Sequence, residues 1–187
     1  VVDQLADAFT RISGKKVEYF LKLRSSGKNI CEPYARKFKT AKFFKGEKPW
    51  GVKADIYIPC ATQNDVNIDS AKLIVKNKGK FYCEGANMPT TNDALEYLQA
   101  NGVFVGPANA ANAGGVSCSA IEMSQNARKM PVSGEEVDEM LRGIMKHIFE
   151  VSEAAAKKYD LGDNIVAGAN IAGFLAVAEA MEAQGLV

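Results

Sequence analysis

Three short apolar runs, separated by helix-like stretches, constrain the fold more than any other feature of the chain. The runs span residues 54 to 58, 80 to 84 and 103 to 105, and stretches with helical periodicity lie between them at residues 69 to 77 and 92 to 100. Strands joined through helices form right-handed crossovers, which build a parallel sheet. The pattern predicts an α/β fold, namely the second half of a doubly wound parallel (Rossmann-like) sheet.

Each apolar run ends in small residues and side-chain amides. The first opens into residues 60 to 64 (CATQN), the second into residues 85 to 87 (GAN) and the third into residues 106 to 109 (GPAN). In an open parallel sheet, ligands bind in the crevice beyond the carboxyl ends of the strands. The three loops therefore predict one shared site.

Helical patterns dominate after the last run. We expect a helix over residues 116 to 129, then a longer one in which Ser133 and Glu136 form a capping box and apolar positions continue to Tyr159. A last, alanine-rich helix is expected from Asn170 to Gln184. This divides the chain into a partial dinucleotide-binding domain (residues 1–110) and a C-terminal helical segment (residues 111–187).

The first fifty residues should form smaller elements. We expect a helix that is capped by Ser13, a short helix holding Tyr34 and Phe38, and an edge strand at 43–44 with Trp50 packed beside it. This part has twelve Lys or Arg against five Asp or Glu, a net charge of +7. The excess is compatible with an anionic or phosphate-bearing partner, and equally with lysines along solvated helix faces.

Several classes of function are disfavoured. The basic and aromatic residues near Lys22 resemble an ordinary amphipathic helix surface more than a nucleic-acid site. No run reaches the ~18 consecutive apolar residues of a membrane span. The four cysteines have no CxxC spacing and His147 is the only histidine, so we expect no metal site. Reduced thiols and a cytoplasmic location fit best, with Cys60 and Cys83 as small core residues.

The glycine pair Gly114-Gly115 precedes the helix expected at residue 116. Free N–H groups and the helix dipole favour a carboxylate at such a point, and hydroxyls follow at Ser117 and Ser119. A tight glycine turn with a serine cap explains the same pattern. The chain contains neither a GxGxxG nor a GxxxxGK[ST] motif, so the usual pyrophosphate turn is missing from it.

Five motifs together carry a family resemblance. They lie at residues 59–64 (PCATQN), 84–91 (EGANMPTT), 112–116 (NAGGV), 122–126 (EMSQN) and 166–174 (VAGANIAGF). In order and spacing they resemble the C-terminal half of the hexameric glutamate dehydrogenases, from about Ser13 to Val187, and look closer to the NADP-preferring bacterial and lower-eukaryotic enzymes than to the animal ones. Residues 1 to 12 have no counterpart in that resemblance.

The resemblance implies reversible oxidative deamination of L-glutamate to 2-oxoglutarate and ammonia, with hydride transfer to NADP or NAD. It also implies a homo-oligomer, as a hexamer, in the complete enzyme. For the cofactor it implies contacts from five residues: Ala61, Thr62 and Gln63 on the ribose and pyrophosphate side, Asn87 near the nicotinamide ribose, and Asn112 facing the nicotinamide. For the substrate it implies Val116 in the glutamate side-chain pocket and Ser119 as a donor to the distal carboxylate.

The departures from the family pattern concern catalysis. The family's catalytic lysine and aspartate belong to an N-terminal substrate domain that is not in this chain, so no catalytic residue is expected here. The C-terminal helices would pack back toward that domain. An alternative is a non-catalytic regulatory or oligomerisation module that is derived from the same scaffold.

Overall fold

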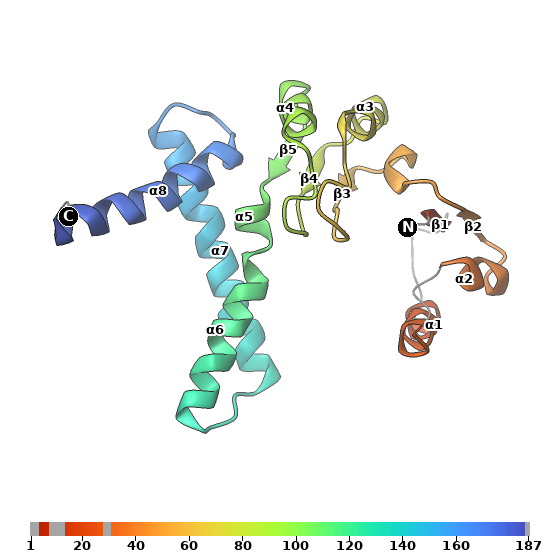
Figure 1. Cartoon of the computed structure of the whole chain (residues 1–187), viewed down its shortest axis with the longest axis horizontal. Coiled ribbons are helices and arrows are strands. Elements are labelled where there is room, and N and C mark those ends of the chain that lie inside the picture. The colour runs from red at the N-terminus through yellow and green to blue at the C-terminus, as the bar shows by residue number, and fades with distance from the viewer. Residues whose placement is uncertain (1–3, 8–13, 28–30, 186–187) are drawn as a thin grey trace. The chain divides into compact units, whose positions relative to one another are not determined.

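The computed structural model describes residues 4–7, 14–27 and 31–185, which fall into two compact units, Val1–Val52 and Lys53–Val187 (Figure 1). The boundary predicted at residue 110 lies inside the second unit. The division into a cofactor part and a C-terminal helical part stays a prediction.

The first unit is built on an aromatic cluster. Helix α1 (Gly14–Ser25) and helix α2 (Glu32–Lys37) are joined by Phe20 and Tyr34, whose rings stack with centroids 4.1 Å apart. Tyr34 is fully buried. Both helices were predicted, whereas the cap expected at Ser13 lies outside the described residues.

A two-stranded antiparallel sheet completes this unit. Strand β2 (Ala41–Phe44) contains the predicted edge strand and pairs with β1 (Gln4–Asp7), for which the sequence offered no counterpart. Trp50 is buried in the 3-10 helix η1 (Pro49–Gly51), as expected.

The second unit contains the predicted parallel sheet. Strands β3 (Ile56–Tyr57), β4 (Phe81–Cys83) and β5 (Phe104–Gly106) lie in the order β3-β4-β5. Helices α3 (Ile68–Lys76) and α4 (Asn92–Ala100) connect them and contact each other (Figure 1). The chain thus follows the β-α-β-α-β order that the alternating pattern predicted.

The two faces of this sheet differ in burial. Tyr57, Tyr82 and Val105 share one register row and are at most 5% exposed. The row beside it points to the other face, where Ile56 and Phe81 are 56% and 49% exposed. One face is therefore a core under α3 and α4, while much of the other is open.

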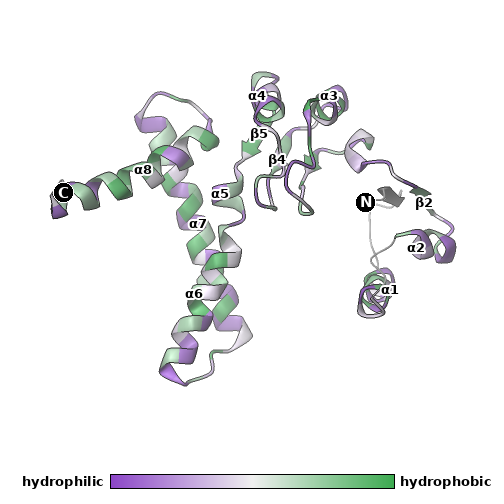
Figure 2. Cartoon of the chain, in the orientation of Figure 1, coloured by the Kyte–Doolittle hydropathy of each residue, from purple (hydrophilic) through white to green (hydrophobic). Residues whose placement is uncertain are grey.

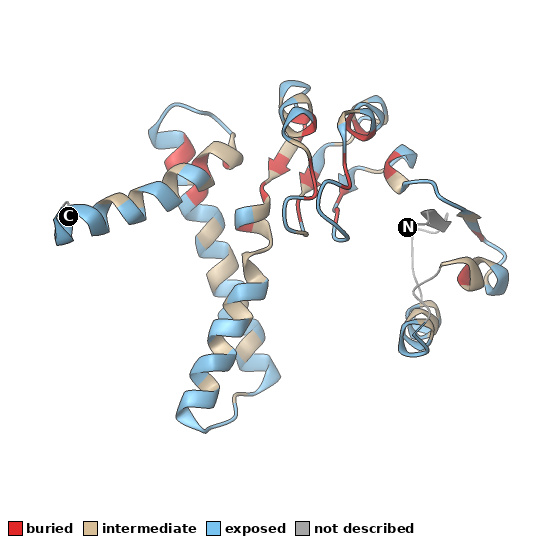
Figure 3. Ribbon diagram, in the orientation of Figure 1, coloured by how far each residue is buried: buried red, intermediate tan, exposed pale blue. Residues whose placement is uncertain are grey.

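Four helices follow the sheet (Figure 3): α5 (Ala108–Ala111), α6 (Ala113–Arg128), α7 (Gly134–Lys158) and α8 (Ile165–Gln184). The capping box of α7 is confirmed, because Ser133 Oγ accepts from the Glu136 amide and the Glu136 carboxylate accepts from the Ser133 amide. Apart from Ala110 of α5, the buried residues of these helices lie where α7 and α8 meet (Figure 3).

Three helices begin earlier than predicted, each for a local reason. Asn67 caps α3 ahead of the expected Asp69 or Ser70, since its side chain accepts from the Ser70 amide at 3.0 Å. Asn164 caps α8 through the Ala167 amide at 3.0 Å, six residues before Asn170. Asn112 keeps a helical backbone conformation, so α6 continues almost directly from α5.

Among the described helices, α8 alone has the length and apolar composition that a membrane span requires. Its apolar surface is broken by Asn170, Glu179 and Glu182 (Figure 2). The beginning of α8 packs against α7, with Ile165 and Gly168 buried.

Candidate functional site

The loops that follow the three strands are joined by main-chain hydrogen bonds. The Ala86 amide donates to the Pro59 carbonyl, the Val66 amide to the Pro89 carbonyl and the Glu84 amide to the Gly106 carbonyl, each at 2.9 Å. These bonds extend the ladder beyond the carboxyl ends of β3, β4 and β5. The predicted convergence of the three loops at one edge of the sheet is confirmed.

Two predicted site residues meet directly at this edge. Asn112 Nδ2 donates to Asn87 Oδ1 at 2.5 Å and lies 3.3 Å from the Ala86 carbonyl oxygen. The pair leaves an amide donor on Asn87 and a carbonyl acceptor on Asn112 for a ligand. A donor beside an acceptor suits a sugar hydroxyl or a carboxamide.

The loop of residues 60–64 stands beside this pair. Ala61, Thr62 and Gln63 are exposed, and Gln63 Nε2 lies 3.9 Å from Met88 Sδ. Asn64 and Met88 both have positive φ angles, 55° and 43°, and the Asn64 amide donates to the Met88 carbonyl. A left-handed backbone at methionine costs about 1–2 kcal/mol, which the surrounding ladder bonds sustain. The hydrogen bonds from Asn64 to Met88 and from Val66 to Pro89 hold the two loops together.

The predicted substrate residues lie further along, on α6. Val116 is 69% exposed, and the exposed Ser119 donates its hydroxyl to the Gly115 carbonyl at 3.3 Å. Gly114 and Gly115 are inside the first turn of α6 rather than ahead of it. The Gly115 amide already donates to the Asn112 carbonyl, so it is not a free donor for a carboxylate.

Two thiols lie near the same edge of the sheet. Cys60 is exposed, so the expectation of a core residue is wrong for it, and Cys83 is half-buried. Burial raises the pKa of Cys83, with smaller contributions from Cys60 and Glu84. A Cβ at Gly85 would lie 2.6 Å from Cys60 Sγ, so a side chain there would require the Cys60 thiol to move.

Sequence reasoning missed one residue of this edge. Glu84 is 4% exposed, and its carboxylate accepts from the Ala108 amide at 2.9 Å. A signal was available, because a carboxylate that directly follows an apolar strand of a parallel sheet is close to the core and requires a partner when it is buried. A second missed link joins Asn109 Nδ2 to Asn170 Oδ1 at 2.9 Å, between α5 and α8.

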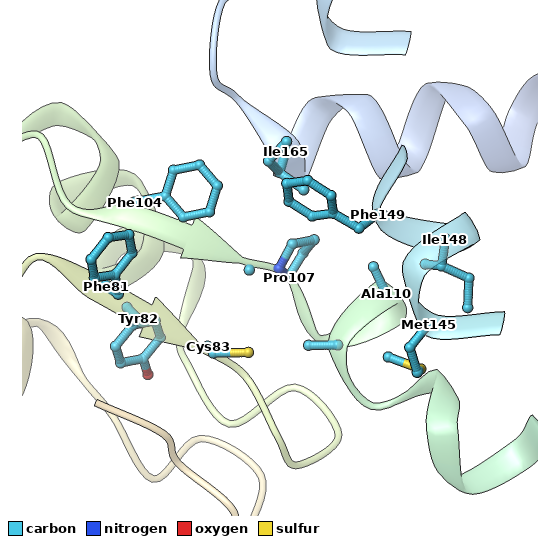
Figure 4. Close-up of a pocket in the computed structure, with 12 residues that line it drawn as sticks. Phe81, Tyr82, Cys83, Phe104, Pro107, Ala110, Met145, Ile148, Phe149 and Ile165 are labelled. Atoms are coloured by element: carbon cyan, nitrogen blue, oxygen red, sulfur yellow. The ribbon is translucent and has the colours of Figure 1, made fainter. Parts of the chain in front are cut away.

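The open face of the sheet carries an apolar pocket of about 250 Å³ (Figure 4). Phe81 and Phe104 form one wall, and Met145 and Phe149 of α7 form part of the other. Its lining is predominantly apolar, which suits packing more than recognition of a charged substrate. His147 is exposed on α7, and no cluster of metal-ligating side chains occurs among the described residues.

A family model described as "Glutamate/Leucine/Phenylalanine/Valine dehydrogenase" matches residues 7–185. The chain belongs to this dehydrogenase family. An NAD-specific glutamate dehydrogenase of Clostridium symbiosum is 53% identical over 173 residues, covering 92% of this chain and 38% of the relative. An NADP-specific glutamate dehydrogenase of Giardia intestinalis is 44% identical over 176 residues, covering 92% of this chain and 39% of the relative.

Solved dehydrogenase structures agree with the fold. A glutamate dehydrogenase structure superposes with a TM-score of 0.89 at 52% identity, over 94% of this chain and 39% of that one. The Plasmodium falciparum glutamate dehydrogenase gives a TM-score of 0.91 at 42% identity, over 98% of this chain and 39% of that one. The chain thus spans about two fifths of the length of these dehydrogenases, as the resemblance to a C-terminal half predicted.

Proposed function

We propose that the complete protein containing this chain is a glutamate dehydrogenase. The reaction converts L-glutamate, water and an oxidised nicotinamide cofactor into 2-oxoglutarate, ammonium, the reduced cofactor and a proton, and it is reversible. The observation that carries the proposal is the Asn87–Asn112 pair at the carboxyl edge of the sheet, in a chain that is 53% identical to a glutamate dehydrogenase.

The residues of this edge fit the nicotinamide and ribose portion of the cofactor. Asn87 and Asn112 supply a donor and an acceptor at the carboxyl edge of the sheet, and the exposed Ala61, Thr62 and Gln63 lie in the neighbouring loop. When bound, the cofactor supplies the hydride acceptor. What this chain contributes is orientation, because a nicotinamide held in one pose reacts faster than a mobile one.

Substrate binding is assigned to the beginning of α6. Val116 and Ser119 are one turn apart along the helix and are both exposed. Val116 offers apolar contact to the glutamate methylene groups, and the Ser119 hydroxyl exchanges its bond to the Gly115 carbonyl for one to the distal carboxylate. The chain then contributes binding groups to both reactants, while the catalytic side chains come from the remainder of the protein.

The cofactor is proposed as a nicotinamide dinucleotide, with NADP as the expected form and NAD as the alternative. Relatives of both specificities match this chain at similar coverage. The homo-hexameric assembly and the cytoplasmic location are proposals too; the four free cysteines accord with a reducing compartment.

The proposal is tested on the complete protein by following reduced nicotinamide after addition of L-glutamate, with NAD and NADP in parallel. We expect turnover with one or both cofactors, and none from the 187-residue chain alone. Absence of glutamate-dependent reduction by the complete protein with either cofactor overturns the assignment and favours a non-catalytic module on the same scaffold.

A further inference from the structure

The carboxylate of Glu84 connects two segments that are far apart in sequence. The main-chain amide of Glu84 donates to the Gly106 carbonyl and so continues the β4–β5 ladder. The side-chain carboxylate of Glu84 accepts a hydrogen bond from the Ala108 amide at 2.9 Å. Ala108 is the first residue of α5, whose first amides have no partner within the helix. Glu84 therefore fastens the end of β4 to the start of α5.

The same two segments meet again at the cofactor residues. Three residues after Glu84, Asn87 accepts from Asn112, which directly follows the last residue of α5. Helix α5 has four residues, so it is a single turn of about 6 Å. A shift at Ala108 is passed to Asn112, because the Asn112 amide donates to the Ala108 carbonyl at 2.9 Å.

From this geometry we propose that Glu84 is a positioning residue for the nicotinamide cofactor, acting through the Asn87–Asn112 pair. It is 4% exposed and faces the interior, so it touches neither reactant. Glu84 fixes the distance between the loop that contains Asn87 and the turn that precedes Asn112. The inference rests on the proposed function, because the role of the amide pair is assigned there.

Reach and charge of the side chain can be separated by two conservative variants. Glu84→Gln keeps an oxygen at the same distance and removes the charge, so it still accepts from the Ala108 amide. Glu84→Asp keeps the charge and is one methylene shorter, so it no longer reaches that amide. If the role is positioning, Glu84→Asp raises the cofactor KM about tenfold or more, while Glu84→Gln stays within about threefold of the wild type. The KM for glutamate changes less than twofold in both.

A double-mutant cycle separates positioning from a general structural role. Glu84→Asp and Asn87→Ala are measured alone and combined in the complete protein, with binding of the oxidised cofactor as the readout. If Glu84 acts through the Asn87–Asn112 pair, the two losses of cofactor affinity are not additive. The double variant then binds the oxidised cofactor about as weakly as Asn87→Ala alone. Gln99→Ala is the matched control, because it removes a 2.9 Å tie to Asn164 in another part of the unit. It should leave cofactor affinity unchanged.

Three results overturn the inference: an unaltered cofactor KM in Glu84→Asp, a Glu84→Gln variant as impaired as Glu84→Asp, or strictly additive effects in the cycle. Thermal unfolding of each variant is recorded as well. If Gln99→Ala loses as much stability and as much cofactor affinity as Glu84→Asp, the effect of Glu84→Asp is one of general stability, and this result also contradicts the inference. Failure of the proposed function is distinguishable, since the wild-type protein itself would then lack glutamate-dependent reduction of the cofactor.

Discussion

Gly168 of α8 lies directly against the main-chain carbonyl of Ser152 in α7. A methyl group placed on Gly168 would overlap that oxygen and lie 3.0 Å from the Cβ of Ala156. Ser152, Ala156 and Gly168 are all buried. The two helices therefore approach closely because three small residues meet at their crossing.

Replacing Gly168 by alanine should destabilise the protein despite the better helix propensity of alanine. The obstacle is main chain rather than a flexible side chain, so α7 and α8 must separate, at a cost of about 1–3 kcal/mol. Gly173→Ala in the same helix is the control, because a Cβ there meets nothing within 4 Å. That substitution should be neutral or stabilise by up to ~1 kcal/mol. Denaturant unfolding measures the change in the free energy of unfolding for both variants, which should have opposite signs or differ clearly. Equal changes would contradict the close contact at the crossing of α7 and α8.

The capping box of α7 predicts a local dependence on pH. Hydrogen bonds from the main chain and the hydroxyl of Ser133 lower the pKa of Glu136 below its usual 4.5. A lowered folded-state pKa gives stabilisation that is fully present above 4.5 and is lost as the pH falls through the folded value. The protection of the Val137 amide against hydrogen exchange, relative to its intrinsic rate, should then fall in acid, because this amide donates to the Ser133 carbonyl in the first turn.

Hydrogen exchange by NMR measures this effect at the first turn of α7. Glu136→Gln keeps an acceptor for Ser133 and does not titrate, so its exchange at Val137, corrected for the intrinsic rate, should not show the acid-dependent loss. The same pH profile in both proteins would mean that the carboxylate is not responsible.

Local sequence patterns predicted the helices and strands, but they did not predict the contacts between residues that are far apart in the sequence. The box at Ser133 and Glu136 was found because both partners lie within one turn. The starts of α3 and α8 were placed too late because several polar residues stood near each, and only the fold selects Asn67 and Asn164. These errors moved boundaries and left the order of elements unchanged.

The site was predicted as a set of loops, and its internal contacts were not. Asn87 and Asn112 are 25 residues apart and come together through the register of β4 and β5. The tie from Glu84 to Ala108 spans 24 residues and depends on the same register. The local sequence shows neither pairing. The resemblance to a family named the two asparagines, while Glu84 could be recognised only as a carboxylate next to an apolar run and not by its partner Ala108.

The thiols at the site should differ in reactivity. Cys60 is exposed, while burial raises the pKa of the half-buried Cys83 and keeps it protonated to higher pH. With iodoacetamide near pH 8, peptide mass spectrometry should find Cys60 modified well before Cys83. Labelling of Cys83 should accelerate as the pH is raised above 9. Equal rates at pH 8 would contradict the burial of Cys83.

The open face of the sheet predicts that the 187-residue chain associates in solution. Ile56 of β3, Phe81 of β4 and Ile58, which follows β3, are 49–56% exposed. Parallel sheets are normally covered on both faces. Ile56→Lys should reduce association without altering the buried Tyr57 face. Light scattering over a concentration series compares the two proteins. A monodisperse monomer for the unsubstituted chain would be the contrary result.

The assignment of α6 to the substrate and of Asn87 to the cofactor predicts a crossed pattern in the complete protein. Ser119→Ala removes one donor to a charged carboxylate, which costs about 1.5–3 kcal/mol and weakens glutamate affinity by roughly one to two decades. Because Ser119 is exposed, its replacement by alanine leaves no buried polar group without a partner, and the fold should tolerate the change. Asn87→Ala should instead weaken cofactor binding and leave binding of a glutamate analogue intact.

Steady-state kinetics with each substrate varied in turn resolves this pattern. Ser119→Ala is expected to raise the KM for glutamate with little change in that for the cofactor, and Asn87→Ala to do the reverse. Ser117→Ala is a matched control on the same turn, because its hydroxyl donates to the Ala113 carbonyl at 2.8 Å and is half-buried. A Ser119→Ala enzyme with unaltered glutamate dependence would show that this hydroxyl does not hold the distal carboxylate, and the beginning of α6 would then serve the substrate through Val116 alone.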